Sequence, residues 1–296
     1  MKIKRIIILS YCLTSVFTWT TAQVRLSFNL ERGTNYACQT EIAQKIKQSA
    51  MGMDLPIEET ITMDLSMNMK EKNEAVFTWQ HISYLLSSPM MKIQYDPKKT
   101  IDNPTTIDKI HEKIFNAAIG KTFTASISQE GQVSSLKGID AISNGATQAV
   151  SSDGEMAGTL GASLISQWIG EETVNGLLEQ WFRIYPNNEV KVGDQWMIDS
   201  DYGFSNKKST IKNVYTLKSI ENDRATITVE ATVEMDFEGI LKGKQTGELI
   251  VDIKTGIPLS SDLNFDIKGT IKQQEMEIQM EMVAKIKTTM KLSLKL

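Results

Sequence analysis

Methionine is the residue type in this sequence whose spacing is most suggestive of chemistry. Three Met-x-Met pairs occur, namely Met51/Met53, Met67/Met69 and Met280/Met282. Thioether sulfur is a soft ligand that selects Cu(I), so an exported copper-binding protein could use such pairs. Alternate residues of a strand also share a face, so a methionine-rich core strand gives the same spacing. Because methionine also suits a deformable apolar cavity, a plain core, an apolar-ligand cavity and a Cu(I) site stay open.

Nucleophile motifs are weak in this chain. Ser134 and Lys137 have the Ser-x-x-Lys spacing, and so do Ser205 and Lys208. Two such matches are what chance gives in a chain with this serine and lysine content. A Gly-x-Ser-x-Gly elbow, which would expose a nucleophilic serine, is absent from the sequence. We therefore predict no catalytic residue and a protein that is not an enzyme.

Metal sites of the zinc type need clustered histidine and cysteine. Beyond the first 22 residues the sequence has His81, His111 and Cys38, which are widely separated. His81 follows the apolar phase of its strand and His111 borders an apolar helix face, so both are predicted to be core or boundary histidines. Cys38 is predicted to be a buried structural thiol. We expect no metal and no cofactor.

The first 22 residues have the pattern of a secretory signal peptide. Lys2, Lys4 and Arg5 precede a short apolar run, and a small residue, Ala22, ends the segment. The run has about 11 residues, fewer than the roughly 18–20 that span a bilayer, so cleavage after Ala22 is favoured over a membrane anchor. The protein is thus predicted to be exported, to the periplasm, cell envelope or extracellular space.

Charge and hydropathy restrict the partners. Removing the three signal cations shifts the formal net charge from −4 to about −7, which argues against a nucleic-acid-binding surface. After signal cleavage no apolar stretch is long enough to be a transmembrane segment. The partner that remains open is a hydrophobic small molecule or lipid.

The segment 105–185 is predicted to be helical. Residues Val174, Leu177, Leu178, Trp181, Phe182 and Tyr185 give Glu171–Tyr185 one apolar helix face, and Pro186 ends it. Ile107–Ala118 has a similar face, whereas Ile139–Val150 and Ala157–Ile169 are rich in small residues. One hairpin, Thr122–Leu136, interrupts the helices.

Both flanks of this segment alternate apolar and polar residues, which predicts half-buried strands. The predicted strands are Val24–Leu30, Tyr36–Gln48, Ile57–Lys70, Ala75–Leu86, Met90–Tyr95, Ile211–Ile220, Ala225–Glu238, Leu249–Ile253, Leu263–Ile271 and Met276–Leu296. Several exceed the usual strand of about 5–6 residues, so the sheet must twist and curl.

The predicted fold class is α+β, in a single β-rich domain over residues 23–296. A long antiparallel meander curls into a partly open barrel, and the central helices cover its concave face. A flat two-sheet sandwich is the alternative, but it leaves the helices without a place.

Three stretches carry a resemblance to a known group of proteins. They are Leu26–Gly33, Val190–Trp196 with its Gly-Asp-x-Trp core, and Gly247–Gly256. In these the chain resembles a family of exported bacterial proteins of unknown function, common in Bacteroidota. In architecture it looks like the periplasmic lipoprotein carriers, whose open β barrel with helices holds acyl chains. The resemblance implies an apolar ligand and no catalytic residues.

The predicted function is a non-enzymatic binding protein for an apolar or lipid-like ligand held between sheet and helices. The residues predicted to line the cavity are Met63, Met67, Trp79, Trp168, Leu178, Trp181, Val233 and Met235. A structural or interaction module of the cell envelope is the alternative, followed by a Cu(I)-binding protein that uses the Met-x-Met pairs.

Overall fold

The computed structural model describes residues 23–204, 207–236, 239–273 and 276–293. The predicted signal peptide, residues 1–22, and Ser205 lie outside them. The strands are β1 (Asn35–Ala50), β2 (Met53–Glu71), β3 (Glu74–Ser87), β4 (Lys92–Tyr95), β5 (Thr122–Ile127), β6 (Val133–Lys137), β7 (Gln195–Phe204), β8 (Lys207–Glu221), β9 (Arg224–Asp236), β10 (Ile240–Asp252), β11 (Pro258–Gln273) and β12 (Met276–Leu292). The helices are α1 (Thr106–Ala118), α2 (Ile139–Ser151), α3 (Glu155–Ile169) and α4 (Glu171–Phe182).

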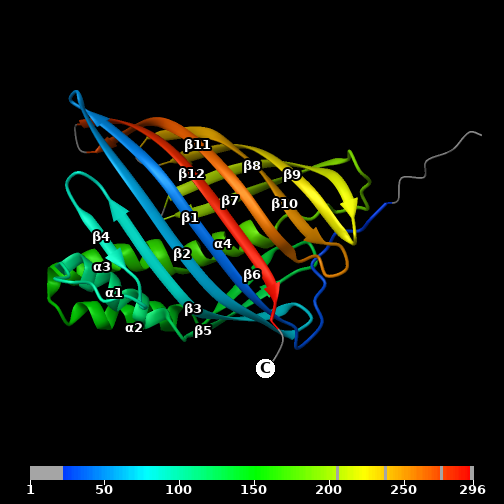
Figure 1. The fold of residues 1–296 in the computed structure, drawn as a ribbon, viewed down its shortest axis with the longest axis horizontal. Coiled ribbons are helices and arrows are strands. Elements are labelled where there is room, and N and C mark those ends of the chain that lie inside the picture. The colour runs from blue at the N-terminus through cyan, green and yellow to red at the C-terminus, as the bar shows by residue number, and fades with distance from the viewer. Residues whose placement is uncertain (1–22, 205–206, 237–238, 274–275, 294–296) are drawn as a thin grey trace, which may run out of the picture.

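The strands form one antiparallel sheet of 12 strands (Figure 1). Its order is β6-β5-β3-β2-β1-β12-β11-β10-β9-β8-β7, and β4 pairs with β3 off this path. The two outermost strands, β6 and β7, do not pair, so the sheet is curled but open. The predicted curled meander is thus confirmed, whereas the balanced α+β class is not, because the molecule is mainly β.

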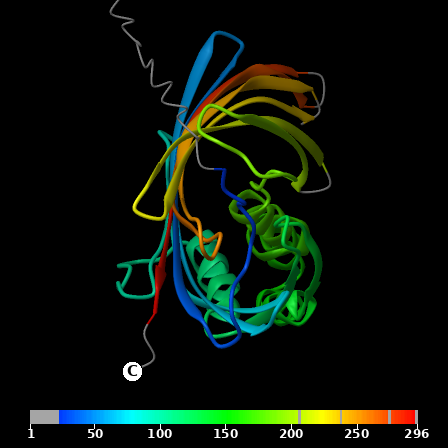
Figure 2. The same ribbon diagram turned by 90° about the vertical axis from the view of Figure 1, so that its right-hand side faces the viewer.

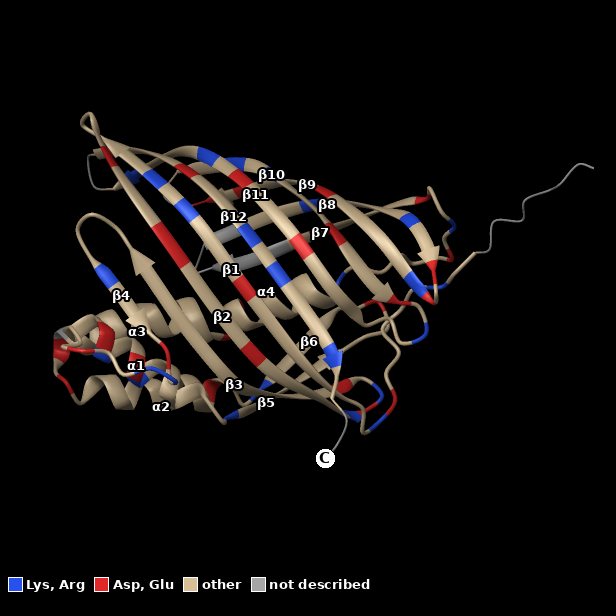
Figure 3. Ribbon diagram, in the orientation of Figure 1, with Lys and Arg blue, Asp and Glu red and all other residues tan. Residues whose placement is uncertain are grey.

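Each long strand has one dry and one wet face, as its period-two sequence predicts. On β9 the inward residues Ala225, Ile227, Val229, Ala231 and Val233 are buried, and the residues between them are Thr and Glu. The wet face carries charged residues of both signs along the strands (Figure 3). Pairs such as Lys45–Glu58 at 3.0 Å and Lys285–Asp262 at 3.1 Å bridge neighbouring strands there.

The helices lie on the concave side of the sheet (Figure 2). Helix α1 begins with a capping box, in which Thr105 Oγ1 accepts from the Asp108 N–H and the Asp108 carboxylate accepts from the Thr105 N–H. Helix α4 ends at Phe182, earlier than the predicted Tyr185. Pro186 has no N–H to donate to the carbonyl of Phe182, so the last turn cannot form.

The predicted strand Val24–Leu30 is the main error in the sequence-based fold. In the structure this segment is an extended strap outside the sheet, with a single bridge between Val24 and Val190. Its N–H groups bond to two turns, Phe28 to Gln129 O and Asn29 to Thr255 O, both at 2.8 Å. Leu26, Phe28 and Leu30 are buried, so the alternation correctly predicted one dry face but not its partner.

The strap defines the two ends of the sheet. The strap end carries the β2–β3, β8–β9 and β10–β11 turns, and the far end carries the β1–β2, β3–β4, β9–β10 and β11–β12 turns. In Figure 1 the far-end turns β1–β2 and β3–β4 lie at the left.

Glycines lie where the backbones of β10 and β11 approach each other closely. A Cβ added at Gly243 would lie 2.1 Å from the Asp266 carbonyl oxygen, and one at Gly247 would lie 2.3 Å from that of Asp262. Gly269, on β11, meets the Ile240 carbonyl in the same way, at 2.4 Å. Because only glycine permits this close approach of backbones, these residues form a glycine corner that curls the sheet.

Candidate functional site

Helix α4 occupies the seam where the sheet fails to close. It contacts both edge strands, β6 and β7. On the β6 side, buried Glu179 accepts a hydrogen bond from the Val133 N–H at 3.0 Å and pairs with Arg183 at 2.9 Å. On the β7 side, the indole N–H of Trp196 donates to the Ile184 carbonyl at 2.9 Å, just beyond the helix. The opening in the barrel is therefore bridged by a helix and not by strand pairing.

An open groove of about 800 Å³ runs along this seam. Its walls come from the β5–β6 turn, the end of α4 and strands β7 and β8. The lining residues are Glu130, Gln132, Arg183, Tyr185, Asn187, Met197, Ile198, Asp199, Lys212, Asn213 and Val214. Two carboxylates and two cations face it, so the groove has no net charge that would select an anion or a cation.

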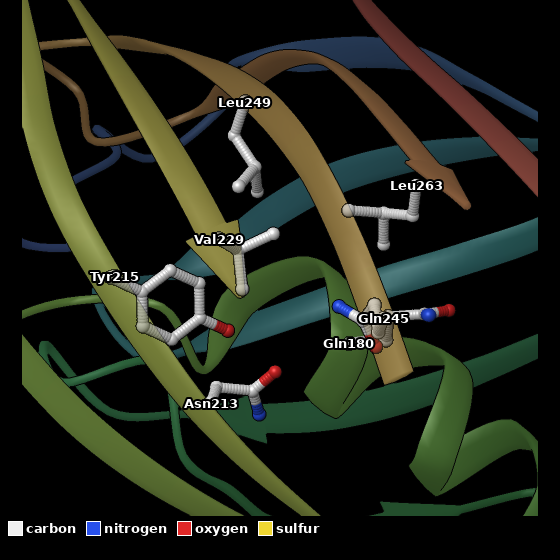
Figure 4. A pocket seen from close by; sticks show the side chains of 7 residues that line it. All are labelled: Gln180, Asn213, Tyr215, Val229, Gln245, Leu249 and Leu263. Carbon is white, nitrogen blue, oxygen red and sulfur yellow. The ribbon is translucent and has the colours of Figure 1, made fainter. Parts of the chain in front are cut away.

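A second hollow, of about 10 Å³, lies between α4 and strands β8–β11 (Figure 4). It is lined by Gln180, Asn213, Tyr215, Val229, Gln245, Leu249 and Leu263. Asn213 also lines the seam groove, and its amide donates to the Ile198 carbonyl at 3.2 Å. The volume suits a single water molecule.

Gln245 is the unusual member of this hollow. It lies on the dry face of β10 and is only 5% exposed. Its side chain lines the hollow together with those of Gln180 and Asn213 (Figure 4). A buried amide costs stability unless it is hydrogen-bonded, so a water or a polar group of a guest in the hollow could bind this group.

The concave face is less covered along part of β2, β1 and β12, whereas inward residues towards the far end of other strands, such as Leu241 and Ile267, are buried. Inward residues near the strap end, such as Met67 and Phe77, are fully buried. Beyond them an inner strip of apolar side chains is only half-buried, and it consists of Ile42, Ile46, Ile57, Met280, Met282 and Ile286. The register joins these residues across β2, β1 and β12, with Ile46 opposite both Ile57 and Met282.

Glu59 borders the inner strip and was not singled out from the sequence. It lies between Ile57 and Ile61 on the dry face of β2, where it accepts a hydrogen bond from the Gln44 amide. Burial raises the pKa of Tyr84 above its ordinary value, and the nearby carboxylate of Glu59 raises it further by a smaller amount. A charged residue on the apolar phase of a strand was the signal that could have identified it.

The eight predicted cavity residues lie in the core. Met63, Met67, Trp79, Leu178, Trp181 and Val233 are buried, and Trp168 and Met235 are half-buried against the core. The linings of the two hollows above include none of them. Trp168 packs against Tyr84, with ring centroids 5.1 Å apart, and Trp181 packs edge-on against Phe182 at 6.1 Å.

The candidate metal ligands are dispersed. His111 stacks on Tyr84 with centroids 4.9 Å apart, and its Nδ1 lies 2.9 Å from the Ile107 carbonyl, so it is a core histidine. Cys38 is buried, and burial raises the pKa of its thiol to about 12. Met67/Met69 lie in the core, Met280/Met282 are half-buried on β12, and Met51/Met53 are exposed at a turn. The three pairs do not meet in one site.

Two kinds of feature are absent from the described residues. No group of three or more His, Cys, Asp or Glu residues there could hold a metal ion. In the same part of the chain, no helix combines the length and the apolar character needed to cross a bilayer.

A protein-family model matches this chain. The model described as "Family of unknown function (DUF6263)" matches residues 75–258, more than half of the chain. The chain belongs to the DUF6263 family. The predicted resemblance to a family of unknown function is confirmed at that level, while export and occurrence in Bacteroidota stay predictions. No curated protein matches this DUF6263 chain.

Three solved structures align with this DUF6263 chain at 7–9% sequence identity. A structure described as lipid–protein interactions in lipovitellin aligns with 90% of the chain at 9% identity, with a TM-score of 0.50. The aligned region is 26% of that lipovitellin chain. The translocator domain of the autotransporter NalP from Neisseria meningitidis aligns over 87% of this chain and 88% of its own, at 7% identity and a TM-score of 0.22. An outer membrane channel from Pseudomonas putida F1 aligns over 88% and 97%, at 8% identity and a TM-score of 0.23.

Proposed function

We propose that this protein is an exported, non-enzymatic binding protein that holds an apolar or lipid-like molecule on the inner face of its sheet. The observation that carries the proposal is the inner strip, where apolar side chains of the concave face are half-buried. Ile46 and Met282 face each other there across β1 and β12, towards the side on which the helices lie. An acyl chain on this strip would gain about 0.8 kcal/mol per buried methylene.

The fold likeness supports the same class of ligand. The lipovitellin structure, which is described in terms of lipid–protein interactions, aligns with 90% of this chain. A shared fold is weak support for a shared ligand, because one fold can host many functions. The inner strip is independent of that likeness, since it follows from burial and register alone.

The packed interior moves the proposed ligand away from the predicted cavity residues. Trp168 and Trp181 contact other aromatic rings, and the hollow beside α4 measures only about 10 Å³. A lipid-sized guest would therefore contact the inner strip and not the space beneath these tryptophans. The same packed interior favours the alternative, a structural or interaction module of the cell envelope.

Two neighbouring positions on β12 provide the test. Met282 belongs to the inner strip, whereas Val283 points outwards and is 58% exposed. Native mass spectrometry of the protein expressed in bacteria should reveal a co-purified lipid, and Met282→Lys should remove it by placing a charge on the strip. Val283→Lys should keep the lipid. A wild-type protein that carries no lipid and binds no fluorescent fatty acid would favour the envelope module.

A further inference from the structure

The turns at the two ends of the sheet differ in chemistry. Six large apolar residues are exposed at the far end, on or beside its turns, and we call them the methionine rim. They are Met51, Met53, Met90, Met91, Ile240 and Met276. The described chain has 12 exposed large apolar residues, so half of them gather at one end of one sheet. Single exposed apolar residues are ordinary, but such a concentration marks an interaction surface.

The turns at the strap end are polar and so differ from those at the far end. Its turns carry Lys72, Asn73, Asn222, Asp223 and Lys254, all of which are exposed. Both ends belong to the same antiparallel strands, so strand pairing does not explain the difference. Figure 3 shows charged residues about the strap end, whereas the tips of the β1–β2 and β3–β4 hairpins are uncharged.

The β1–β2 turn carries a methionine where turn chemistry favours another residue. Met51 has φ +52° and precedes Gly52 at φ +75°. Asn222 and Asp223 occupy the matching positive-φ positions of the β8–β9 turn, at +50° and +60°. Asparagine, aspartate and glycine adopt this conformation readily, and methionine does not. Met51 is also 81% exposed, so neither local conformation nor core packing accounts for it.

We propose that the methionine rim docks this protein on the surface of a phospholipid bilayer. The rim residues sit on separate hairpins, and a fluid bilayer can accept separate tips without a matching rigid surface. Two cations near the rim are paired with carboxylates, Lys47 with Asp54 at 2.8 Å and Lys272 with Glu277 at 3.9 Å, whereas Lys92 beside Met91 is exposed. Docking is therefore driven by apolar insertion and not by attraction to anionic lipids.

The position of the rim relates it to the proposed function. Met276, at the start of β12, is four residues from Met280, the first member of the inner strip on that strand. A bilayer at the rim would thus lie close to the inner strip. The docking itself does not rest on ligand binding, because the rim residues lie outside the inner strip.

Flotation with phosphatidylcholine vesicles tests the proposal on the full chain. The wild-type protein should float with the vesicles, equally at low and high salt, because apolar insertion is not screened. A rim variant combining Met51→Asn, Met53→Ser, Met90→Ser and Met91→Ser should reduce the bound fraction by at least about tenfold. Met51→Asn suits the positive φ, so the turn is preserved.

Met197 provides a matched control, since it is 78% exposed but lies on β7, away from the rim. Met197→Ser should float like the wild type. A rim variant that floats undiminished, or a wild type that stays in solution, overturns the proposal. Native mass spectrometry on the same samples separates the two ideas: lipid retained by a protein that does not float leaves the binding function intact. A floating protein without bound lipid supports the rim and rejects the binding function.

Discussion

The Tyr185 hydroxyl donates a hydrogen bond of 2.6 Å to the carbonyl oxygen of Gly256, inside the core. It joins the segment after α4 to the β10–β11 turn, which are far apart in the chain. Burial raises the pKa of Tyr185 above its ordinary value, so the phenol remains a donor. The strap crosses the same turn, because Asn29 N–H bonds to Thr255 O. The segment after α4 and the strap are therefore both held at the strap end by the β10–β11 turn.

Removing this hydroxyl tests its role. Tyr185→Phe should lower the free energy of unfolding by about 1–3 kcal/mol, because the Gly256 carbonyl loses a buried donor. Urea denaturation followed by tryptophan fluorescence measures it. Tyr95→Phe is the control: its hydroxyl bonds to exposed Asn116 at 2.7 Å, where water can substitute, so the loss should be smaller. Equal losses in the two variants would contradict this explanation.

A side chain at Gly256 should displace the strap. Gly256 has φ +74°, and an added Cβ would lie 1.9 Å from the Ser27 carbonyl oxygen. Gly256→Ala should therefore cost more than the roughly 1–2 kcal/mol of left-handed strain alone, and proteolysis near the strap should accelerate. Gly33→Ala is the control, since Gly33 has φ +82° but no atom within 4 Å. If Gly33→Ala proved as costly as Gly256→Ala, the contact with the strap would not be the reason.

Gln245→Leu should stabilise the protein. The substitution replaces a buried amide on the dry face of β10 with an apolar side chain of similar length. We expect the free energy of unfolding to rise by about 0.5–2 kcal/mol, measured by urea denaturation. Gln195→Leu, at an exposed position where the amide bonds to Thr216 at 3.1 Å, should change stability little. A loss of stability in Gln245→Leu would show that a buried water satisfies the amide.

The Cys38 thiol should be unreactive towards alkylation in the folded protein. Its burial should also make the free energy of unfolding decrease at alkaline pH. Burial raises its pKa from 9.0 to about 12, so the folded state keeps its proton after the unfolded state has lost it. The contribution of Cys38 is therefore complete below pH 9.0 and is lost as the pH rises towards 12. Cys38→Ala should flatten this decline. Alkylation mapped by mass spectrometry at pH 8 should modify Cys38 only in urea, and rapid native labelling would argue against the burial.

Periodicity predicted the curled sheet, whereas the ligand-binding role of the predicted site residues stays a prediction. The alternation in β9, from Ala225 to Val233, fixed which face is dry without any knowledge of neighbouring strands. The same alternation in Val24–Leu30 was misleading, because period two reports burial of one face and not the partner that buries it. Core tryptophans such as Trp181 were chosen as cavity lining because size and apolar character do not distinguish packed from open surroundings.

The features that the sequence analysis missed were each a residue out of its usual place. Gln245 and Glu59 are polar residues on an apolar phase, and Met51 is an apolar residue in a turn. Such exceptions mark positions where folding alone does not choose the residue. Their spatial relations could not be predicted, because they depend on pairings between distant strands such as β1 with β12.

The glycine corner limits how far the curvature of the sheet can change. At Gly243 and Gly247 the backbones of β10 and β11 are in close contact. The curvature between these two strands is therefore set by main-chain contact, and side-chain movements cannot change it. The opposite boundary, where α4 meets β7, lacks a strand ladder and is tied at the Trp196 indole by one hydrogen bond. If the curled sheet opens to admit a ligand, we therefore expect it to open where α4 meets β7. The part of the sheet formed by β10 and β11 should stay fixed.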